Sequence, residues 1–554
     1  MPVSANPPLP SGRRFLDWPG LWLLLPLSCH FGFSWIGFTP TDDGWMLALA
    51  RRFMDGHVPY RDFIFVFPGL SVLLQMPLLL VGGDHVIWLS RLWGWLTIGA
   101  VCWIWSGRLV PAEAPRLLRH LVYVAATLLC AHTFPVQGWH SLDGMLLLSI
   151  AVVLAGRNTP VSLRAAFICT GLAGLCRQNF AFFPLILLLA VPHPDKWRAA
   201  LWTALPPLIY VAATLLAGCL PDFVHQVTST GGEFVQVAFV RYFRHLGFLL
   251  AVPAGATVAW ILPRRPLVSW FGSALLLASA GYGAYCLTQG TGAYFNYAFQ
   301  LFGFVIGFTL IVAKRGWTPA DRLMLLGGIG LTWVTAISIG YNSPALMSGV
   351  LWCLLWRLIH LSAPTRPFTL LPTTLAALAI GAGFWQGRQL HPYRDRPAAD
   401  LRWDVGEVLP GGAGLRTNQL TYATLLDLKN LTDRFRAEHR LYGILTDGSA
   451  YWIRSPEQNP LPCEWPQATA LGYNRKLFAR FYAALEAMPV GSRVIVQKFH
   501  ISEYSWIVAP IASDHPYFEV QNWVRRHFRK VEETSFFAVY EPAVLGQATP
   551  TPGN

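Results

Sequence analysis

The stretch from Thr41 to Phe63, TDDGWMLALARRFMDGHVPYRDF, concentrates ionisable side chains in a part of the chain with few acidic residues. It begins with the adjacent carboxylates of Asp42 and Asp43. Two carboxylates this close repel each other, which tends to raise the pKa of one, and such a group can serve as a general base. The structural alternative is that Asp42 or Thr41 caps a following helix, whose dipole also favours a carboxylate there. The pair alone leaves both interpretations open.

Residues 43–55 have the period of an amphipathic helix, in which Arg51 and Arg52 fall on a polar arc. The apolar arc consists of Trp45, Met46, Leu49 and Phe53. This pattern predicts an interfacial helix at a membrane surface. In that position the two arginines bind either lipid headgroups or an anionic substrate.

Two more arginines follow this helix in the sequence. Arg61 is adjacent to Asp62, so a salt bridge within the loop explains it as well as a ligand does. Arg91 comes early in the second apolar segment, where snorkelling to the membrane interface is an equally good explanation.

Polar residues also interrupt later apolar segments. His140 lies three residues before Asp143 in WHSLDG, a polar turn in which a solvated histidine is the alternative to a functional one. Arg177, Gln178 and Asn179 break an apolar segment, and polar groups at such a break usually face a cavity. The sequence therefore predicts a second functional region around 137–180.

The composition indicates which elements must position these groups. A hydrophobic fraction of 54% with 13% charged residues predicts a polytopic α-helical membrane protein. The net charge of +13 could suggest nucleic acid, but the excess lies in short loops of the apolar part. This is the positive-inside pattern, so we expect no nucleic-acid partner. The nine cysteines show neither a disulfide framework nor zinc-ligand spacing.

The alternation of basic and non-basic loops predicts the topology. An uncleaved first span follows Arg13 and Arg14 on the inside and leads to a long outer loop of about 40–86. We expect about 11–13 transmembrane helices, with about 13 as the direct count, which places the following domain outside. The expected spans are about 20–39, 87–106, 120–136, 144–156, a broken pair within 165–191, 199–218, 246–262, 268–287, 297–313, 323–340, 345–361 and 369–385.

Residues 389–554 read as a small extracytoplasmic α/β domain that follows a transmembrane domain of residues 1–388. Amphipathic helices are expected at 419–438, 476–488 and 519–530. Short apolar strands are expected at 441–446, 493–499 and 535–541.

With these features the chain resembles the GT-C superfamily of polyprenyl-phosphate-sugar-dependent membrane glycosyltransferases, which includes protein O-mannosyltransferases and aminoarabinose lipid A transferases. The likeness consists of the long first outer loop with an acidic pair shortly after the first span, the element GHVPYRDFIFVFPGLSVLL (Gly56 to Leu74), and the second acidic site in WHSLDG. The architecture covers residues 10–385, but the specific residues are confined to 40–75 and 137–180. The pair is Asp-Asp where Asp-Glu is common in the family.

The resemblance implies transfer of a sugar from a polyprenyl-phosphate carrier to a hydroxyl group of a lipid, polysaccharide or protein, outside a bacterial inner (plasma) membrane. Asp42 is then the general base, a role worth roughly 10²–10⁴-fold in rate, and Asp43 or Asp143 orients the acceptor. The leaving phosphate needs fixed cations or hydrogen-bond donors. The candidates for this role are Arg51, Arg52, Arg61, Arg91, His140, Arg177 and Gln178.

The same resemblance implies no cofactor and no metal, although Asp42, Asp43 and Asp143 would also suit a divalent cation. The expected partners are the lipid-linked donor, the glycan, lipid or protein acceptor, and membrane lipids. Two other classes stay open. A transporter or flippase for lipid-linked sugars should show inverted repeats with matching helix breaks, and only one break is evident. A non-enzymatic membrane assembly protein is the third.

Overall fold

The computed structural model describes residues 20–542 except 133–135, 192–194, 230–235, 263–267, 315, 338–341, 363–369, 446, 468–470, 473, 502–507 and 512–514. Arg13 and Arg14, on which the predicted orientation begins, lie outside the described residues. So does the expected basic turn at 263–266.

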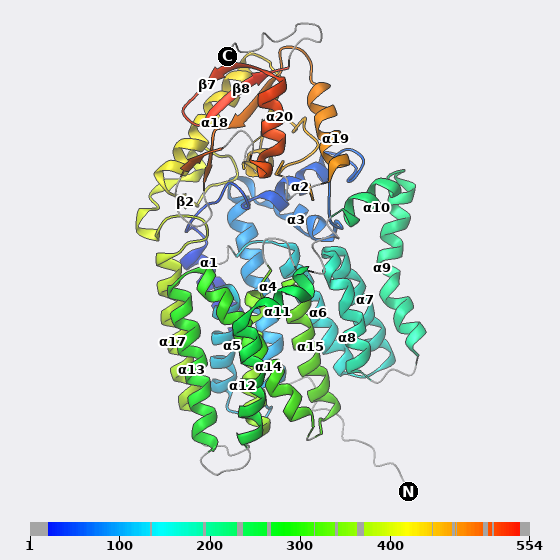
Figure 1. The fold of residues 1–554 in the computed structure, drawn as a ribbon, viewed down its shortest axis with the longest axis vertical. Coiled ribbons are helices and arrows are strands. Elements are labelled where there is room, and N and C mark those ends of the chain that lie inside the picture. Colours follow the sequence, from blue (N-terminus) through cyan, green and yellow to red (C-terminus); the bar gives the residue numbers. More distant parts are fainter. Residues whose placement is uncertain are drawn as a thin grey trace.

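Helices form the part of the molecule that precedes residue 391 (Figure 1). They are α1 (Leu21–Phe33), α2 (Trp45–Met54), α3 (Leu70–Val81), α4 (Val86–Leu109), α5 (Arg116–Ala131), α6 (His140–Gly156), α7 (Pro160–Cys176), α8 (Phe183–Ala190), α9 (Lys196–Leu216), α10 (Leu220–Thr228), α11 (Arg241–Arg244), α12 (Leu246–Ile261), α13 (Val268–Thr288), α14 (Thr291–Ala313), α15 (Pro319–Ala336), α16 (Ser348–Ser362) and α17 (Leu370–Leu390). Most expected spans correspond to one of these helices.

Length and composition qualify fewer helices as membrane spans than the sequence predicts. Five described helices are long and apolar enough to cross a membrane, or six if a pair bent by 73° at residue 245 is one span. The five are Gly83–Leu109, Lys196–Leu216, Trp270–Thr288, Thr291–Ala313 and Pro344–Ser362. The expected 11–13 spans therefore require shorter helices to cross as well. The first predicted span, 20–39, is too long, because α1 ends at Phe33.

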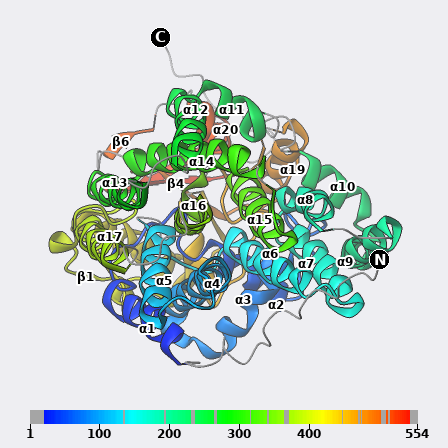
Figure 2. The same ribbon diagram turned by 90° about the horizontal axis from the view of Figure 1, so that it is seen from below.

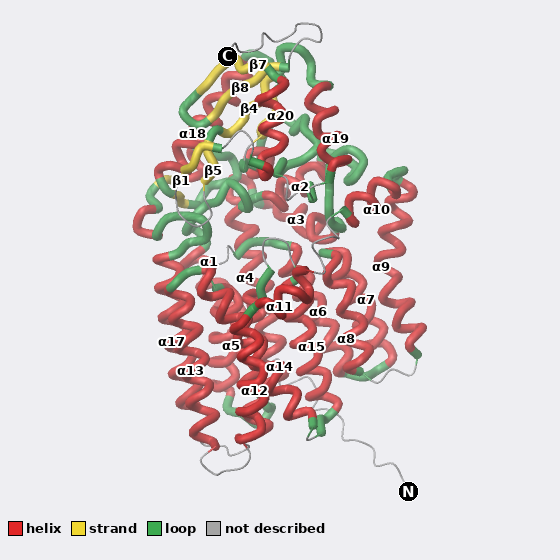
Figure 3. Tube along the Cα trace, in the orientation of Figure 1, coloured by secondary structure: helices red, strands yellow, loops and turns green. Residues whose placement is uncertain are grey.

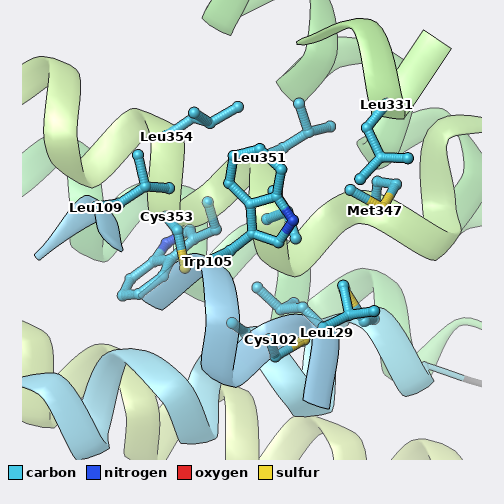
Figure 4. Packing of buried hydrophobic residues seen from close by; sticks show 14 of the residues in the cluster. Cys102, Trp105, Leu109, Leu129, Leu331, Met347, Leu351, Cys353 and Leu354 are labelled. Carbon is cyan, nitrogen blue, oxygen red and sulfur yellow. The ribbon is translucent and has the colours of Figure 1, made fainter. Parts of the chain in front are cut away.

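The central helix of the bundle is α16, which Figure 2 shows surrounded by its neighbours. Nearly all of its residues are buried. Figure 4 shows how Leu351, Cys353 and Leu354 of α16 pack beside Trp105 of α4 and Leu129 of α5. Close packing of this kind holds helices together by van der Waals contacts, which do not depend on removing apolar area from water.

Two arginines of the predicted basic loops, Arg108 and Arg157, lie at one end of the bundle. α4 begins beside the C-terminal domain, where Ala413 N donates to Asp84 O at 2.9 Å. At 1.5 Å per residue its length is about 36 Å, so Arg108 in its last turn lies at the far end. Arg157, which follows α6, is within electrostatic reach of Arg108. These two arginines therefore lie away from the C-terminal domain, as the predicted alternation requires.

The C-terminal region combines strands and helices at one end of the molecule (Figure 3). Its main sheet has the order β3-β4-β8-β7, with β3 parallel to β4 and the other pairs antiparallel. The elements are β1 (Trp403–Asp404), β2 (Arg416–Thr417), α18 (Gln419–Ala437), β3 (Tyr442–Leu445), α19 (Arg475–Glu486), β4 (Arg493–Gln497), β5 (Phe499–Ile501), β6 (Val508–Pro510), α20 (Glu519–His527), β7 (Arg529–Glu533) and β8 (Phe537–Glu541). The predicted small α/β region is confirmed, although residues 529–530 begin a strand where a helix was expected.

The first loop and the C-terminal region share one hydrophobic core. Leu47 and Leu49 of α2 belong to the same buried cluster as Ile495 of β4 and Val539 of β8. The helix expected at 43–55 is present, but it packs under the C-terminal region. Because of this packing, Arg52 is buried and pairs with Glu464, and it also donates to Leu461 O. The prediction that Arg52 binds lipid headgroups or a substrate phosphate is therefore wrong.

We expect Glu464→Gln to lower the free energy of unfolding by about 3–5 kcal/mol, because it leaves the Arg52 guanidinium buried without a counter-charge. Asp55→Asn is the matched control, since the Arg51–Asp55 pair of the same helix is partly exposed and is worth at most about 1 kcal/mol. Thermal unfolding of the detergent-purified variants measures both. Equal losses in the two variants would contradict this assignment.

Candidate active site

The acidic pair lies in the turn between α1 and α2 and does not cap the helix. The residue that caps α2 is Gly44, whose φ of 81° is in the left-handed region and which provides no side-chain bond. A side chain at Gly44 would also collide with Ile453, because the short helix Ser449–Ile453 packs against this end of α2. The prediction that Thr41 or Asp42 caps the helix is therefore wrong, and the two carboxylates bind other partners.

Asp43 is closed off from solvent and paired with Arg91. Its Oδ2 accepts hydrogen bonds from Thr39 N at 2.8 Å and from Arg91 Nη2 at 3.0 Å. Burial raises the pKa of Asp43, Arg91 opposes this, and repulsion from Asp42 is the smallest contribution. The repulsion between Asp42 and Asp43 that the sequence suggested is thus only a minor cause of the raised pKa of Asp43.

Arg91 holds the chain that leaves α1. Its guanidinium donates to the carbonyl oxygens of Ser34 and Gly37, each at 2.7 Å, and of Ile36 at 3.3 Å. The side chain is only 4% exposed. Neither of the sequence interpretations fits, because a guanidinium that is buried and bonded to the backbone neither snorkels nor presents itself to a phosphate.

Asp42 faces the segment that follows α17. Its Oδ2 accepts a hydrogen bond from the Tyr393 hydroxyl at 2.8 Å and pairs with Arg394 Nη1 at 3.0 Å. Its Oδ1 accepts no hydrogen bond from the described residues, and the side chain is 11% exposed. Gln137 fixes the backbone by donating to Asp42 O at 3.3 Å. Asp42 therefore keeps one oxygen available to a ligand.

The partners of Asp42 belong to the sequence HPYRDR (391–396), which our sequence analysis did not select. Arg394 has a φ of 49°, and non-glycine residues held in this region are concentrated at functional sites. Asp395 next to it accepts bonds from Phe38 N at 2.9 Å and from the Thr417 hydroxyl at 2.8 Å. A run of charges directly after the last apolar segment was the signal that could have found this segment.

Asp143 and His140 lie at the start of α6 and are both buried. Asp143 Oδ1 accepts a hydrogen bond from Trp93 Nε1 at 2.9 Å, and Ser71 of α3 lies beside the carboxyl group. His140 is 5% exposed, so the alternative of a solvated histidine is wrong. Asp143 has its own set of neighbours and does not share a partner with Asp42 among the described residues.

The break after α7 is present, since Arg177 has an extended backbone between α7 and the short helix Gln178–Phe182. Arg177 Nη1 donates to the Ser141 hydroxyl at 3.3 Å. Gln178 Nε2 donates to Val66 O at 2.8 Å and to Val227 O at 3.2 Å. These bonds connect the break to α6 and to the first loop, so Gln178 is a structural link.

The two remaining arginines form local pairs. Arg51 bonds to Asp55 at 2.8 Å, one helical turn away. Arg61 bonds to Asp62 at 2.9 Å and is half-exposed, as the salt-bridge alternative predicts. The neighbouring Tyr60 is buried and its hydroxyl bonds to the Tyr210 hydroxyl of α9 at 2.8 Å, so the GHVPYRDF element fastens the loop to the bundle.

Two cavities differ greatly in size. One of about 20 Å³, with Asp43 and Arg91 in its wall, has room for about one water molecule. The other has about 390 Å³, within the range of ligand pockets, and its walls are Gln236, Val237, Arg241, Arg244 and Asn342. Neither Arg241 nor Arg244 is among the residues predicted from the sequence to bind phosphate. Within the described ranges, no group of three or more His, Cys, Asp or Glu side chains is placed to hold a metal ion.

No protein-family model matches the sequence, and no curated protein matches it. The resemblance to the GT-C superfamily thus stays a prediction based on the motifs quoted above. The function must be argued from the arrangement around Asp42 and from the second cavity.

We expect Asp43→Asn to destabilise the protein more than Asp42→Asn does. The first change leaves the buried Arg91 without its counter-charge, at a cost of about 3–5 kcal/mol. The second affects a more exposed pair, because the Arg394 side chain is 18% exposed and that of Asp42 is 11% exposed, so the loss of stability should be smaller. The measurement is thermal unfolding of both variants in the same detergent at pH 7.5. An equal or greater loss for Asp42→Asn would identify Asp42 as structural.

Proposed function

We propose that this protein is a membrane glycosyltransferase that moves a sugar from a polyprenyl-phosphate carrier to a hydroxyl group outside the cytoplasm. The observation that carries the proposal is the geometry of Asp42. One carboxylate oxygen is held by Tyr393 and Arg394, and the other has no hydrogen-bond partner among the described residues. A general base needs this combination of fixed orientation and one accessible oxygen.

The reaction is an inverting displacement. The acceptor hydroxyl gives its proton to Asp42 Oδ1 while its oxygen forms a bond to the anomeric carbon. The bond from that carbon to the phosphate oxygen breaks on the opposite face, and the polyprenyl phosphate leaves with the electron pair. Tyr393 and Arg394 keep the carboxylate of Asp42 in position, and Asp43, which is closed off by Arg91, supports the turn.

The side of the membrane is proposed from charge. Arg108 and Arg157 lie at the end of the bundle away from the C-terminal region, and positive loops favour the cytoplasmic side. The acidic pair and the C-terminal region would then be extracytoplasmic. A lipid-linked donor with an acceptor in the cell envelope is consistent with this orientation.

The best candidate for binding the donor phosphate is the cavity of about 390 Å³ with Arg241 and Arg244 in its wall. Guanidinium groups bind phosphate oxygens in pairs and stabilise the developing charge. The guanidinium carbon of Arg241 lies 5.5 Å from the ring centre of Phe299 in α14.

Asp42→Asn tests the catalytic assignment. With the purified protein in liposomes and a polyprenyl-phosphate hexose as donor, we expect release of polyprenyl phosphate to fall by 10²-fold or more, because Asn cannot accept the proton. Asp55→Asn on α2 is the control and should retain activity. Transfer by Asp42→Asn at the wild-type rate would overturn the assignment. Movement of the intact lipid-linked sugar across the membrane without cleavage would favour a transporter.

Arg244→Gln tests the donor pocket. Loss of one charged hydrogen bond to the phosphate should raise the KM for the lipid-linked donor about tenfold or more. The KM for the acceptor should not change. Arg61→Gln is the control, because Arg61 is also exposed and paired within its own loop. A normal donor KM in Arg244→Gln would exclude this cavity as the phosphate site.

A further inference from the structure

The main C-terminal sheet presents polar side chains at one edge that the proposed reaction does not use. β3 and β4 are parallel, so their carboxyl ends lie at the same edge. Asp447 follows β3, and its backbone N–H donates to Oε1 of Gln497, the last residue of β4, at 3.1 Å. The two side chains therefore lie together where these strands end.

Asp447 has one fixed and one open oxygen, as Asp42 does. Its Oδ1 accepts hydrogen bonds from Trp465 Nε1 at 3.3 Å and from Gln467 Nε2. The Tyr517 hydroxyl donates to Gln467 and so supports this arrangement. Within the described part of the chain no donor reaches Oδ2, and the residue is only half-buried. The carboxyl group is therefore oriented and still able to accept a hydrogen bond.

This group faces the candidate active site. Asp447 is within electrostatic reach of both Arg394 and Asp42. The short helix that begins two residues later packs on the N-terminal end of α2, where a β-carbon at Gly44 would lie 3.0 Å from Ala450 Cβ. The C-terminal region thus brings a carboxylate of its own to the acidic turn, with Arg394 as the cation common to both acids.

Aromatic rings line the same place. The ring of Trp465 lies 5.5 Å from that of Trp45, and Trp45 lies 5.4 Å from Trp139. Binding pockets for small molecules combine apolar and aromatic walls with a few placed polar groups. A sugar ring matches this combination, because it has apolar C–H faces and a rim of hydroxyl donors that carboxylates accept.

We propose that Asp447, Trp465 and Trp45 form a binding subsite for a neutral sugar ring, whose hydroxyl groups donate to Asp447 Oδ2. The inference rests on the proposed function for its place in the reaction, where the ring belongs to either the donor sugar or a glycan acceptor. Asp447 binds and positions this ring, and Asp42 remains the group that takes the proton.

The energetics of Asp447 fit a binding role better than a structural one. The pKa of Asp447 is raised to about 6, mainly by burial, and repulsion from Asp42 acts in the same direction. The hydrogen bonds from Gln467 and Trp465 and the positive charge of Arg394 lower this pKa but do not outweigh burial. An acid with a higher pKa in the folded state stabilises the protein at low pH, and this stability is lost as the pH rises to about 6. At pH 7.5 the ionised group therefore costs stability.

The experiment measures binding of free glucose, galactose, mannose and N-acetylglucosamine to the full-length protein in detergent by saturation-transfer NMR. We expect the wild type to bind at least one of them and Asp447→Asn to bind it at least tenfold more weakly. Asp433→Asn, which changes an exposed acid of the same region, should bind normally. At pH 7.5 the thermal midpoint of Asp447→Asn should equal or exceed that of the wild type.

The proposal is overturned if the wild type binds none of the four sugars, if Asp447→Asn binds them normally, or if this variant unfolds at a clearly lower temperature. Transfer kinetics of Asp447→Asn then distinguish the two sources of the ring. A KM for the lipid-linked sugar above the wild-type value supports a donor subsite, and a KM for the acceptor above the wild-type value supports an acceptor subsite. Binding that depends on Asp447 in a protein without transfer activity would support the subsite and refute the proposed function.

Discussion

The contact between Arg91 and the chain after α1 is the constraint on which the site depends. Where a chain leaves a helix inside a protein, its buried backbone carbonyl groups need donors, and an arginine supplies several in a fixed geometry. Arg91 bonds to the carbonyls of Ser34, Ile36 and Gly37, which follow α1, and also to Asp43. The turn is thereby fixed before any ligand binds. Asp42, which directly precedes Asp43, is thereby held with its side chain against the segment after α17.

Adjacent carboxylates in this turn have different surroundings, and their different roles follow from this. Asp43 is 1% exposed and bonded to Arg91 and a backbone N–H, so it serves the fold. Asp42 is likewise bonded at one oxygen, but its side chain is 11% exposed, whereas the unbonded Oδ1 of Asp43 is buried. Two neighbouring carboxylates of the same type are thus given different surroundings by the fold. Asp447, on a separate part of the chain, is also hydrogen-bonded at one carboxylate oxygen only among the described residues.

Local sequence patterns predicted most helices and strands, but they did not predict which side chains form ion pairs and hydrogen bonds with each other. The period of 43–55 predicted α2, the polar break at 176–179 predicted the end of α7, and the apolar runs predicted β3, β4 and β8. β7 was missed because its sequence RKVEE lies on a sheet edge, where charged residues replace the apolar alternation. Arg52 and Glu464 are 412 residues apart, and nothing local in the sequence distinguishes a buried partner from an exposed one. The same holds for Asp42 and Tyr393, so the acidic pair was found and its surroundings were not.

The shared core of α2 and the C-terminal sheet has a consequence for how the chain is made. α2 is complete after the first 54 residues, but its partners in β4 and β8 extend to residue 541. At about 5–20 residues per second, ribosomes need roughly 25–100 s to make the intervening chain. During that time α2 can pack on α3 and on the rings of Phe65 and Phe67, which belong to the same buried cluster, but the side chains that meet β4 and β8 have no partners yet. The core around α2 is therefore completed only when the last strand of the C-terminal sheet has been made.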